Sequence, residues 1–275
     1  MESTPLITIV MPVYNGSKYI AETIKSVLNQ SYKNFELFVI DNASTDNTVS
    51  IVKMYSDPRI ILIQNQENIG FLRNWNLALS LGKGTYFKLL PADDILLKKC
   101  LEKQVQSFAI FNEKVSIVCC PRNIIDGQGK NLMVRGFKVK ELSYMTSKEA
   151  IKKVIRSGAN PIGEPGAVLI RRSLINKVGQ FNPKNLYTID LNYWVRCLKY
   201  GGLAIQPEPL AEFRLHHHST SVGLVKEQIL QYAQFLAWSK IEFEFLTGFD
   251  LAKGRLLSTI STFGRYLIYK FIIRD

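Results

Sequence analysis

The first hundred residues alternate regularly between strand-like and helix-like patterns, and this alternation constrains the fold more than any other feature. Residues 6–14, LITIVMPVY, form an apolar run rich in β-branched residues, which is typical of a strand covered on both faces. Helical spacing of apolar residues follows over 17–30. The alternation continues with strands predicted over 35–44, 59–65 and 85–94 and helices predicted over 46–55 and 71–81. Such β-α-β units predict a parallel, twisted, Rossmann-like sheet with right-handed crossovers.

The rest of the chain has a mixed pattern that becomes helical towards the end. We predict strands over 115–120 and 166–172, a helix over 147–157 with Ser147 as its N-cap, and a helix over 190–200. The stretch 127–144 has no clear pattern, and residues 223–275 read as helical and amphipathic. The prediction is therefore an α/β domain over 1–222, with a mostly parallel sheet flanked by helices, and a helical C-terminal extension over 223–275.

Composition bounds the class of protein. The chain has 275 residues, of which 47% are hydrophobic, and no run approaches the roughly 18 apolar residues of a membrane span. The start, MESTPLITIVMP, lacks the basic region and the cleavage site of a signal peptide, so we expect a cytoplasmic protein. The four cysteines have neither zinc-ligand spacing nor a disulfide framework, and we expect them to be small buried residues.

The charge balance favours anionic partners. The formal net charge is +12, and much of the excess lies between Lys98 and Arg156. No helix-turn-helix, zinc finger or aromatic–basic RNA module is present, so nucleic acid is not the expected partner. The basic section and the apolar, basic extension together suggest contact with an anionic membrane surface, at the cytoplasmic face.

Polar residues gather where the predicted strands end. They are Tyr14, Asn15, Asp41, Asn42, Asn65, Asn68, Asp93 and Asp94. Ligands of open α/β sheets bind beyond the carboxyl ends of the strands, so we expect these residues to surround a ligand. The first strand ends in MPVYNG, without the glycine pattern of a dinucleotide site, and no P-loop occurs. This chemistry suits a ligand whose diphosphate is held by a cation.

Asp93 and Asp94 are the candidate cation ligands. Adjacent carboxylates at a strand end can bind Mg²⁺ or Mn²⁺, hard cations that bridge phosphates. The alternative is that one of them caps a helix starting near Ile95.

The order of several motifs resembles the inverting GT-A glycosyltransferases of family 2. The motifs are VMPVYNG, VIDNASTDNT, ENIGFLRNWNLAL with GKGTYFKLL, PADDIL, AVLIRRSLINKVGQF, TIDLNYWVRCL and the pattern of Arg214, His216, Ser219 and Ser221. They span residues 6 to 222. The resemblance implies a GT-A fold with a nucleotide-binding half over about 1–98 and an acceptor-binding half over about 99–222.

The resemblance also implies a donor site for a nucleotide sugar. Tyr14, with the backbone of Pro12 and Val13, would pack against the base, and Asp41 would accept the imide N–H of uracil. Cytosine has no such N–H, so a UDP-sugar is favoured, while thymidine and guanosine donors stay open. The other candidate donor-binding residues are Asn15, Asn68, Arg73 and Asp93; the alternative for Arg73 is a surface position on its helix.

The resemblance assigns the metal and the base. Asp93 and Asp94 match the metal motif, although Pro91 stands where many members have another aspartate, and His216 is expected near the metal or diphosphate. Asp190 matches the general base that takes the proton of the acceptor hydroxyl. Ile189 precedes it where the family usually has glutamate. On the same helix, Tyr193 and Trp194 could stack on the acceptor sugar or pack in the core. His217 and His218 are expected to be packing or surface residues.

The sequence therefore predicts an inverting, metal-dependent glycosyltransferase. Its donor would be a nucleotide sugar and its acceptor a saccharide or lipid-linked oligosaccharide, in cell-surface polysaccharide assembly. Two alternatives remain, a nucleotidyltransferase and a non-catalytic nucleotide-sugar binding protein. The second alternative is motivated by Pro91 and Ile189.

Overall fold

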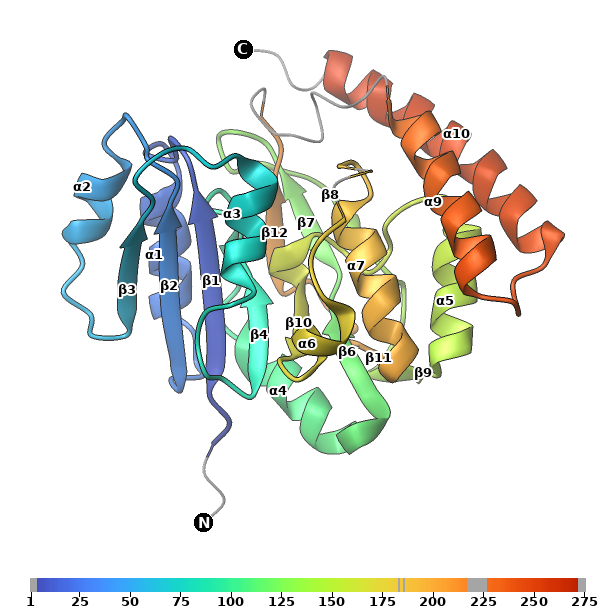
Figure 1. Ribbon diagram of the computed structural model, residues 1–275, viewed down its shortest axis with the longest axis horizontal. Coiled ribbons are helices and arrows are strands. Elements are labelled where there is room, and N and C mark those ends of the chain that lie inside the picture. Colours follow the sequence, from blue (N-terminus) through green and yellow to red (C-terminus); the bar gives the residue numbers. More distant parts are fainter. Residues whose placement is uncertain (1–3, 183, 185, 217–226, 272–275) are drawn as a thin grey trace.

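A twisted sheet of eight strands forms the centre of the molecule (Figure 1). The computed structural model describes residues 4–182, 184, 186–216 and 227–271, except for the side chains of the last five. The strand order is β3-β2-β1-β4-β10-β6-β11-β9. The strands are β1 Ile7–Val13, β2 Phe35–Asp41, β3 Ile60–Gln64, β4 Tyr86–Leu89, β6 Val115–Cys119, β9 Ser143–Met145, β10 Val168–Arg171 and β11 Gly202–Ile205. The predicted α/β class with a mostly parallel sheet is confirmed.

Helices cover both faces of this sheet (Figure 1). They are α1 Ile20–Leu28, α2 Thr48–Lys53, α3 Phe71–Ala78, α4 Cys100–Phe111, α5 Ser147–Ser157, α6 Leu174–Val178, α7 Ile189–Cys197, α9 Gln228–Glu242 and α10 Gly248–Phe271. Ile9 and Met11 of β1 pack into the core cluster that includes α1 and α4, whereas Val10 packs into the cluster that includes α3 and α7. This alternation explains why β1 is apolar at every position.

Two strands of the large sheet run against the parallel set. β10 pairs antiparallel with both β4 and β6, and β9 pairs antiparallel with β11. The β4–β10 pairing is short, with Phe87 opposite Ile170 and Tyr86 opposite Arg171. Lys88 of β4 is fully buried beside this junction, and its Nζ donates hydrogen bonds to the backbone oxygens of Gly166 and Val168 at 2.8 and 2.9 Å. Burial lowers the pKa of its ammonium group.

A second sheet of four strands, β5-β12-β7-β8, lies beside the first. Its strands are β5 Ile95–Leu96, β7 Arg122–Ile125, β8 Asn131–Arg135 and β12 Ala211–Arg214. The predicted strand over 85–94 ends at Leu89, and the chain after Asp94 forms β5 instead of a helix. The interpretation of Asp93 or Asp94 as a helix cap is therefore wrong, because the next helix begins only at Cys100.

The N-cap of α5 is one residue earlier than predicted. Thr146, not Ser147, has the extended cap conformation, and its side chain accepts a hydrogen bond from the backbone N–H of Glu149. The Glu149 carboxylate accepts the Thr146 N–H in return at 2.9 Å. This reciprocal pair is a capping box, and Ser147 cannot form it because the partner must lie three residues further on.

The C-terminal helices α9 and α10 pack beside α5 (Figure 1). Tyr232 and Phe235 of α9 belong to the same core cluster as the strands of the large sheet. The division of the chain at residue 222 stays a prediction. Among the described residues, no helix combines the length and apolar character required to cross a membrane.

Two glycines allow α10 to approach α5 closely. A Cβ at Gly254 would lie 2.2 Å from the backbone oxygen of Ile155, and a Cβ at Gly158 would lie 2.3 Å from the backbone nitrogen of Ser258. Gly158 ends α5 in the left-handed region, with φ of 65°. The two helices therefore touch through backbone, and side chains at either glycine would force them apart.

We predict that Gly254→Ala destabilises the fold by about 1–3 kcal/mol, because the added methyl group meets backbone that cannot yield locally. The matched control is Gly264→Ala on the same helix, where a Cβ meets nothing within 4 Å. This control should stabilise the fold by up to about 1 kcal/mol through helix propensity. Urea denaturation measures both, and equal effects of the two variants would contradict the close contact.

Candidate functional site

A cleft of about 770 Å³ opens at the carboxyl ends of β1 and β4. β1 lies between β2 and β4, so the strand order changes direction here, and open α/β sheets bind ligands at such a point. Segments distant in sequence line the cleft. They are residues 12–16, 91–93, 159–160, 164–165 and 186–191, together with Lys18, Tyr19, Arg122, Arg135, Phe213, His216, Tyr232, Ser261, Gly264 and Arg265 among others.

Seven of the predicted site residues line this one cleft. They are Pro12, Val13, Tyr14, Asn15, Asp93, Asp190 and His216. The structure thus brings the expected base-binding segment, two of the three expected metal ligands and the expected general base into one space. Four other predicted site residues, Asp41, Asn68, Arg73 and Asp94, do not line it.

Asp41 lies immediately behind the cleft wall. It ends β2 directly opposite Val13, and its side chain is only 1% exposed. Its Oδ2 accepts the backbone N–H of Ser44 at 3.1 Å. Its Oδ1 is buried and has no hydrogen-bond partner among the described residues. A buried carboxylate oxygen without a partner is costly, so Asp41 Oδ1 has unused capacity to accept a hydrogen bond.

Tyr14 and Asn15 stand at the mouth of the cleft. Tyr14 is 49% exposed and is therefore available to contact a flat ligand. Asn15 adopts a positive φ of 51°, and its Oδ1 accepts the backbone N–H of Thr45 at 2.8 Å. Its own N–H donates to Ser44 Oγ at 2.9 Å. Asn15 therefore ties the loop after β1 to the loop after β2, and its amide oxygen is already engaged.

Asn68 and Arg73 have positions outside the cleft. Asn68 Oδ1 accepts hydrogen bonds from Asn42 Nδ2 at 2.7 Å and from the Gly70 N–H at 2.9 Å. Asn42 in turn accepts from Asn65 Nδ2 at 2.9 Å, so these amides fix the loop before α3. Arg73 is exposed on α3, as its alternative reading expected. A role for either residue in donor binding stays a prediction.

Asp93 and His216 meet within the cleft. Asp93 Oδ2 and His216 Nε2 are 2.9 Å apart, although 123 residues separate them. Arg214 holds the two residues near each other, since its Nε donates to the backbone oxygen of Asp93 at 3.0 Å. Its Nη2 pairs with Glu22 Oε2 at 2.6 Å, and its guanidinium stacks over the Tyr19 ring at 4.6 Å. Arg214 thus holds the end of β12 against the loop that carries Asp93.

Asp94 has a different environment from its neighbour. It is 1% exposed, and its Oδ1 accepts the backbone N–H of Arg214 at 3.2 Å. Burial, reinforced by the negative charge of Asp93, raises the pKa of Asp94 well above its usual range. The buried side chain of Asp94 therefore links the loop after β4 to β12.

The residues present fit a divalent cation held jointly with a substrate. Asp93 offers a carboxylate and His216 an imidazole, whereas the described residues contain no group of three or more side chains suited to hold a metal. Mg²⁺ and Mn²⁺ commonly take one or two protein ligands and complete their shell with phosphate oxygens and water. Asp93 and His216 fit this pattern, and the internal position of Asp94 does not.

Asp190 lies in the first turn of α7 and faces the cleft. Its Oδ2 accepts a hydrogen bond from Asn160 Nδ2 at 2.9 Å, and its Oδ1 accepts the Leu191 N–H at 2.7 Å. Burial, together with the negative charge of Glu164, raises the pKa of Asp190 to about 7. A carboxylate with this pKa can accept a proton near neutral pH.

The network behind Asp190 was not predicted from the sequence. Arg122 of β7 forms a buried ion pair with Glu164, and its Nη2 also donates to the backbone oxygen of Asn160 at 3.0 Å. Although burial opposes ionisation, Arg122 lowers the pKa of Glu164. Arg122 Nη1 is buried without a partner among the described residues. The only sequence signal was the turn NPIGEP, which holds Asn160 and Glu164 before β10.

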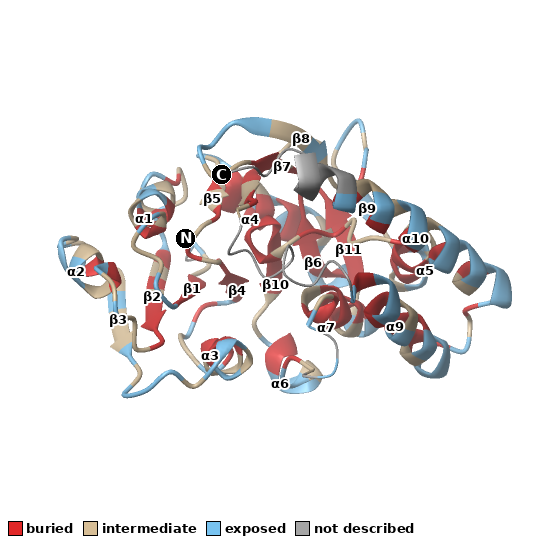
Figure 2. Ribbon diagram, turned by 90° about the horizontal axis from the view of Figure 1, so that it is seen from above, coloured by how far each residue is buried: buried red, intermediate tan, exposed pale blue. Residues whose placement is uncertain are grey.

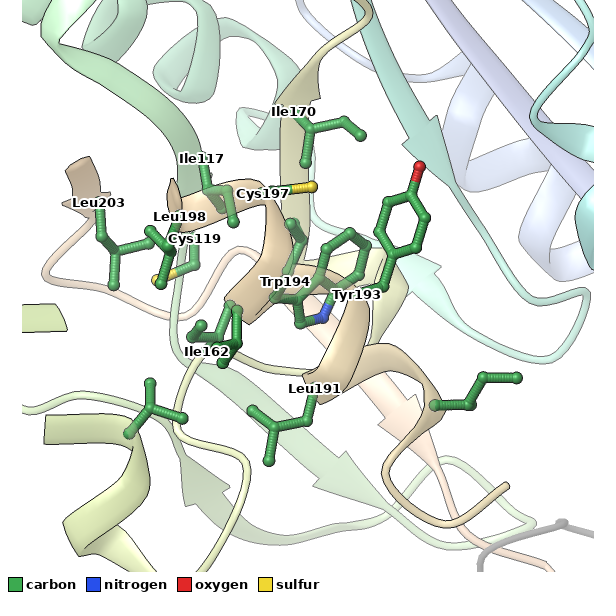
Figure 3. Close-up of a cluster of buried hydrophobic side chains, with 14 of the residues drawn as sticks. Ile117, Cys119, Ile162, Ile170, Leu191, Tyr193, Trp194, Cys197, Leu198 and Leu203 are labelled. Carbon is green, nitrogen blue, oxygen red and sulfur yellow. The ribbon is translucent and has the colours of Figure 1, made fainter. Parts of the chain in front are cut away.

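Of the two alternatives for Tyr193 and Trp194, packing in the core is confirmed. Both are buried in the core, with 0% and 3% exposure (Figure 3). Trp194 Nε1 donates to the Gly163 backbone oxygen at 3.0 Å, so its polar group is satisfied internally. α7 turns these rings inward while Asp190 faces the cleft. His217, His218, Ser219 and Ser221 lie outside the described residues. All four cysteines are buried and free, as expected.

Residues 8–179 match the protein family described as glycosyl transferase family 2. The putative glycosyltransferase EpsE of Bacillus subtilis (strain 168) is 43% identical over 209 residues, which cover 73% of this chain and 69% of EpsE. The putative teichuronic acid biosynthesis glycosyltransferase TuaG of the same organism is 32% identical over 221 residues, which cover 79% of this chain and 82% of TuaG.

Solved structures share the fold. The crystal structure of S. aureus TarS 1–349 in complex with UDP-GlcNAc has a TM-score of 0.66 and 17% identity, over 96% of this chain and 73% of that one. The mannosyltransferase PcManGT from Pyrobaculum calidifontis, in complex with GDP-Man and Mn²⁺, has a TM-score of 0.64 and 16% identity, over 97% of this chain and 81% of that one. The GT-A fold implied by the sequence is thereby confirmed.

We predict that Asp94→Asn keeps the stability of the fold and Asp94→Ala loses about 1–3 kcal/mol. The amide can still accept the Arg214 N–H, whereas alanine leaves that buried donor without a partner. The folded-state pKa of Asp94 is raised, so the stability it contributes when protonated is lost as pH rises above the unfolded value of about 3.9. The stability of Asp94→Asn relative to that of the wild type should therefore increase as pH rises.

Urea denaturation across the pH range measures these differences. Glu67→Gln serves as the control, because Glu67 is exposed and does not line the cleft. Equal losses of stability in Asp94→Asn and Asp94→Ala would contradict the role of the Asp94 side chain as a buried hydrogen-bond acceptor.

Proposed function

Since the chain belongs to glycosyl transferase family 2, we propose that it transfers a sugar from a nucleotide diphosphate to an acceptor hydroxyl with inversion at the anomeric carbon. The observation that carries this proposal is that one cleft gathers the Asp93–His216 pair and Asp190, with the unsatisfied oxygen of Asp41 directly behind its wall. Donor, cation and proton acceptor can thus occupy a single space.

The proposed donor is a UDP-sugar. Tyr14 at the mouth of the cleft would lie against the base, and Asp41 Oδ1 would accept the ring N–H of uracil. The structural neighbour TarS holds UDP-GlcNAc, and the neighbour PcManGT holds GDP-Man. Guanine also carries a ring N–H, so both donors agree with a carboxylate acceptor at this position.

The proposed cofactor is Mn²⁺ or Mg²⁺, held by Asp93 and His216. When bound, the cation would neutralise charge that develops on the leaving diphosphate. The presence of Mn²⁺ in the PcManGT complex supports a divalent cation in this fold. Arg214 keeps the two ligand-bearing segments together before any cation binds.

Asp190 is proposed as the general base. Its carboxylate would take the proton of the acceptor hydroxyl as that oxygen attacks the sugar from the face opposite the diphosphate. Asn160 Nδ2 donates to one carboxylate oxygen of Asp190, and this hydrogen bond fixes the orientation of the carboxylate. A single displacement of this kind needs no covalent intermediate and inverts the anomeric carbon.

The proposed acceptor is a saccharide or lipid-linked oligosaccharide of a cell-surface polysaccharide. The name of TuaG, a relative with 32% identity, points to the synthesis of such a polymer. The cleft wall opposite the nucleotide segment includes Leu186, Tyr187, Tyr232 and Arg265, which would bind the acceptor. A cytoplasmic location remains part of the proposal.

We predict that Asp190→Asn lowers turnover by about 10²–10⁴-fold while the affinity for UDP with Mn²⁺ changes little. The amide preserves the shape of the side chain but cannot accept the proton. Steady-state kinetics and calorimetric UDP titration separate these effects. Retained turnover would remove Asp190 as the base, and a nucleotide-binding protein without catalysis would show no turnover even in the wild type.

We predict that kcat/KM of the wild type rises with pH through about 7 and then levels, because only the ionised carboxylate of Asp190 can accept the proton. Asn160→Ala removes a donor to that carboxylate, so its pKa rises and the limb should move to higher pH. The pH–rate profiles of the two proteins measure this change. If kcat/KM of Asn160→Ala rose at the same pH as that of the wild type, the result would contradict an effect of Asn160 on the pKa of Asp190.

We predict that Asp41→Asn weakens UDP binding by about 10–100-fold and narrows the preference for UDP over CDP. The variant loses a charge-assisted hydrogen bond worth about 1.5–3 kcal/mol, and its amide N–H can donate to the ring nitrogen of cytosine. Calorimetry with both nucleotides measures the change. The control is Asp57→Asn, which alters an aspartate paired with Arg59 outside the cleft. An equal loss for both nucleotides would contradict base recognition by Asp41.

A further inference from the structure

Helix α10 has its polar and apolar sides reversed relative to a helix that packs on a protein core. Its buried residues are small or polar, namely Asp250, Gly254, Ser258, Thr262 and Arg265. Its outward side carries Phe249, Leu256, Ile260 and Phe263, which are 66%, 63%, 59% and 65% exposed. A surface helix normally buries its large apolar side chains and exposes its polar ones.

The inward side of α10 is polar because that side is satisfied within the protein. Asp250 pairs with Arg156 of α5, and Arg265 donates from Nε to Gln228 Oε1 at 2.7 Å and from Nη1 to Ser261 Oγ at 2.7 Å. Gly254 lets α10 touch the backbone of α5. These contacts fix the rotation of the helix about its axis. The apolar residues therefore face outward as a consequence of a specific interface and not of a loosely held helix.

The exposed apolar residues form one continuous stripe. Phe249, Leu256, Ile260 and Phe263 follow one another at intervals of seven, four and three residues, which places them on one side of a helix. Fourteen residues separate the first from the last, so the stripe is about 21 Å long. Figure 2 shows this outer side of α10 exposed along the edge of the molecule. An apolar stripe of this length on a protein surface marks an interaction site.

The charges beside the stripe identify the partner. The exposed residues of α10 up to Tyr266 are Gly248, Phe249, Ala252, Lys253, Arg255, Leu256, Thr259, Ile260, Phe263 and Tyr266. Lys253 and Arg255 lie on either side of the stripe, and none of these residues is acidic. The acidic residue of α10 within this part, Asp250, is fully buried in its pair with Arg156. A second copy of this chain would set these cations against cations, whereas an anionic lipid surface would match both the charge and the apolar stripe.

We propose that the outer face of α10, defined by Phe249, Lys253, Arg255, Leu256, Ile260 and Phe263, docks on the surface of an anionic lipid bilayer. The apolar side chains enter the boundary between headgroups and acyl chains, and the two cations contact lipid phosphates. The helix lies in the plane of the surface and does not cross the bilayer.

The opposite side of the same helix lines the cleft through Ser261, Gly264 and Arg265. Docking would therefore hold the acceptor side of the cleft one helix diameter, about 10–12 Å, from the lipid surface. This geometry suits a saccharide attached to a lipid in that surface, a consequence that rests on the proposed function. The docking itself does not depend on turnover.

Sedimentation of the full chain with vesicles tests the docking. The vesicles contain either phosphatidylcholine alone or phosphatidylcholine with about a third phosphatidylglycerol. The apolar variant is Leu256→Gln/Ile260→Gln/Phe263→Gln. Its matched control is Met54→Gln/Ile110→Gln, which removes two equally exposed apolar residues away from α10. Met54 directly follows α2, at the opposite end of the molecule (Figure 1). Neither set changes the net charge.

We expect the wild type and the control to bind the anionic vesicles and the apolar variant to bind at least about tenfold more weakly. Lys253→Glu/Arg255→Glu should weaken binding more than Lys25→Glu/Lys53→Glu, which changes the net charge equally on α1 and α2. If the net charge of +12 alone drove binding, the apolar variant would bind like the control, and the proposal would be overturned.

Light scattering of the same proteins without lipid tests whether the stripe instead binds a second copy of this chain. A dimer that dissociates in the apolar variant, combined with vesicle binding that is unchanged, would assign the stripe to a second copy and overturn lipid docking. UDP affinity measured on the same variants separates the two proposals. Loss of vesicle binding with normal UDP affinity supports docking whatever the outcome for the reaction, and failure of wild-type UDP binding would count against the proposed function alone.

Discussion

The antiparallel entry of β10 between β4 and β6 is the constraint on which the cleft depends. A parallel strand delivers to the ligand edge the residues that follow it, whereas an antiparallel strand delivers the residues that precede it. Residues 159–167 therefore arrive at the cleft because β10 runs the other way. The fully buried Lys88 secures this arrangement, since its ammonium group binds the backbone oxygens on either side of Ala167. A single reversed strand thus brings Asn160 and Glu164 opposite the end of β1.

This reversal explains what the sequence could and could not predict. The apolar run of β1 and the helical spacing after it are local signals, so the first four strands and the sites at their ends were predicted. The approach of His216 to Asp93 was expected only from a resemblance, because 123 residues separate the two and no local pattern links them. Asn160 and Glu164 were not predicted because they precede their strand, whereas the sequence pattern points to residues that follow strands. Tyr193 and Trp194 had two alternatives because helical spacing does not reveal which side of α7 meets the core.

Four carboxylates in and beside the cleft have different surroundings. Asp93 is partly exposed and faces His216, whereas the adjacent Asp94 is buried against a backbone N–H and has a raised pKa. Asp190 is intermediate, since burial and Glu164 raise its pKa to about 7. Glu164 itself is held ionised by Arg122. The ion pair therefore does more than join β7 to the loop before β10, because its two members act on Asp190 in opposite directions: Glu164 raises the pKa of Asp190 and Arg122 lowers it.

The polar inward side of α10 explains how the cleft and the outer surface are related. One side of α10 lines the cleft, and the residues that it places there are small or polar, namely Ser261, Gly264 and Arg265. Its contact with α5 also uses glycine and an ion pair in which only Asp250 is fully buried. The remaining side is the only one on which Leu256, Ile260 and Phe263 can lie. The apolar stripe is therefore held at a fixed orientation to the cleft, and any surface that binds the stripe also fixes how the cleft is oriented to that surface.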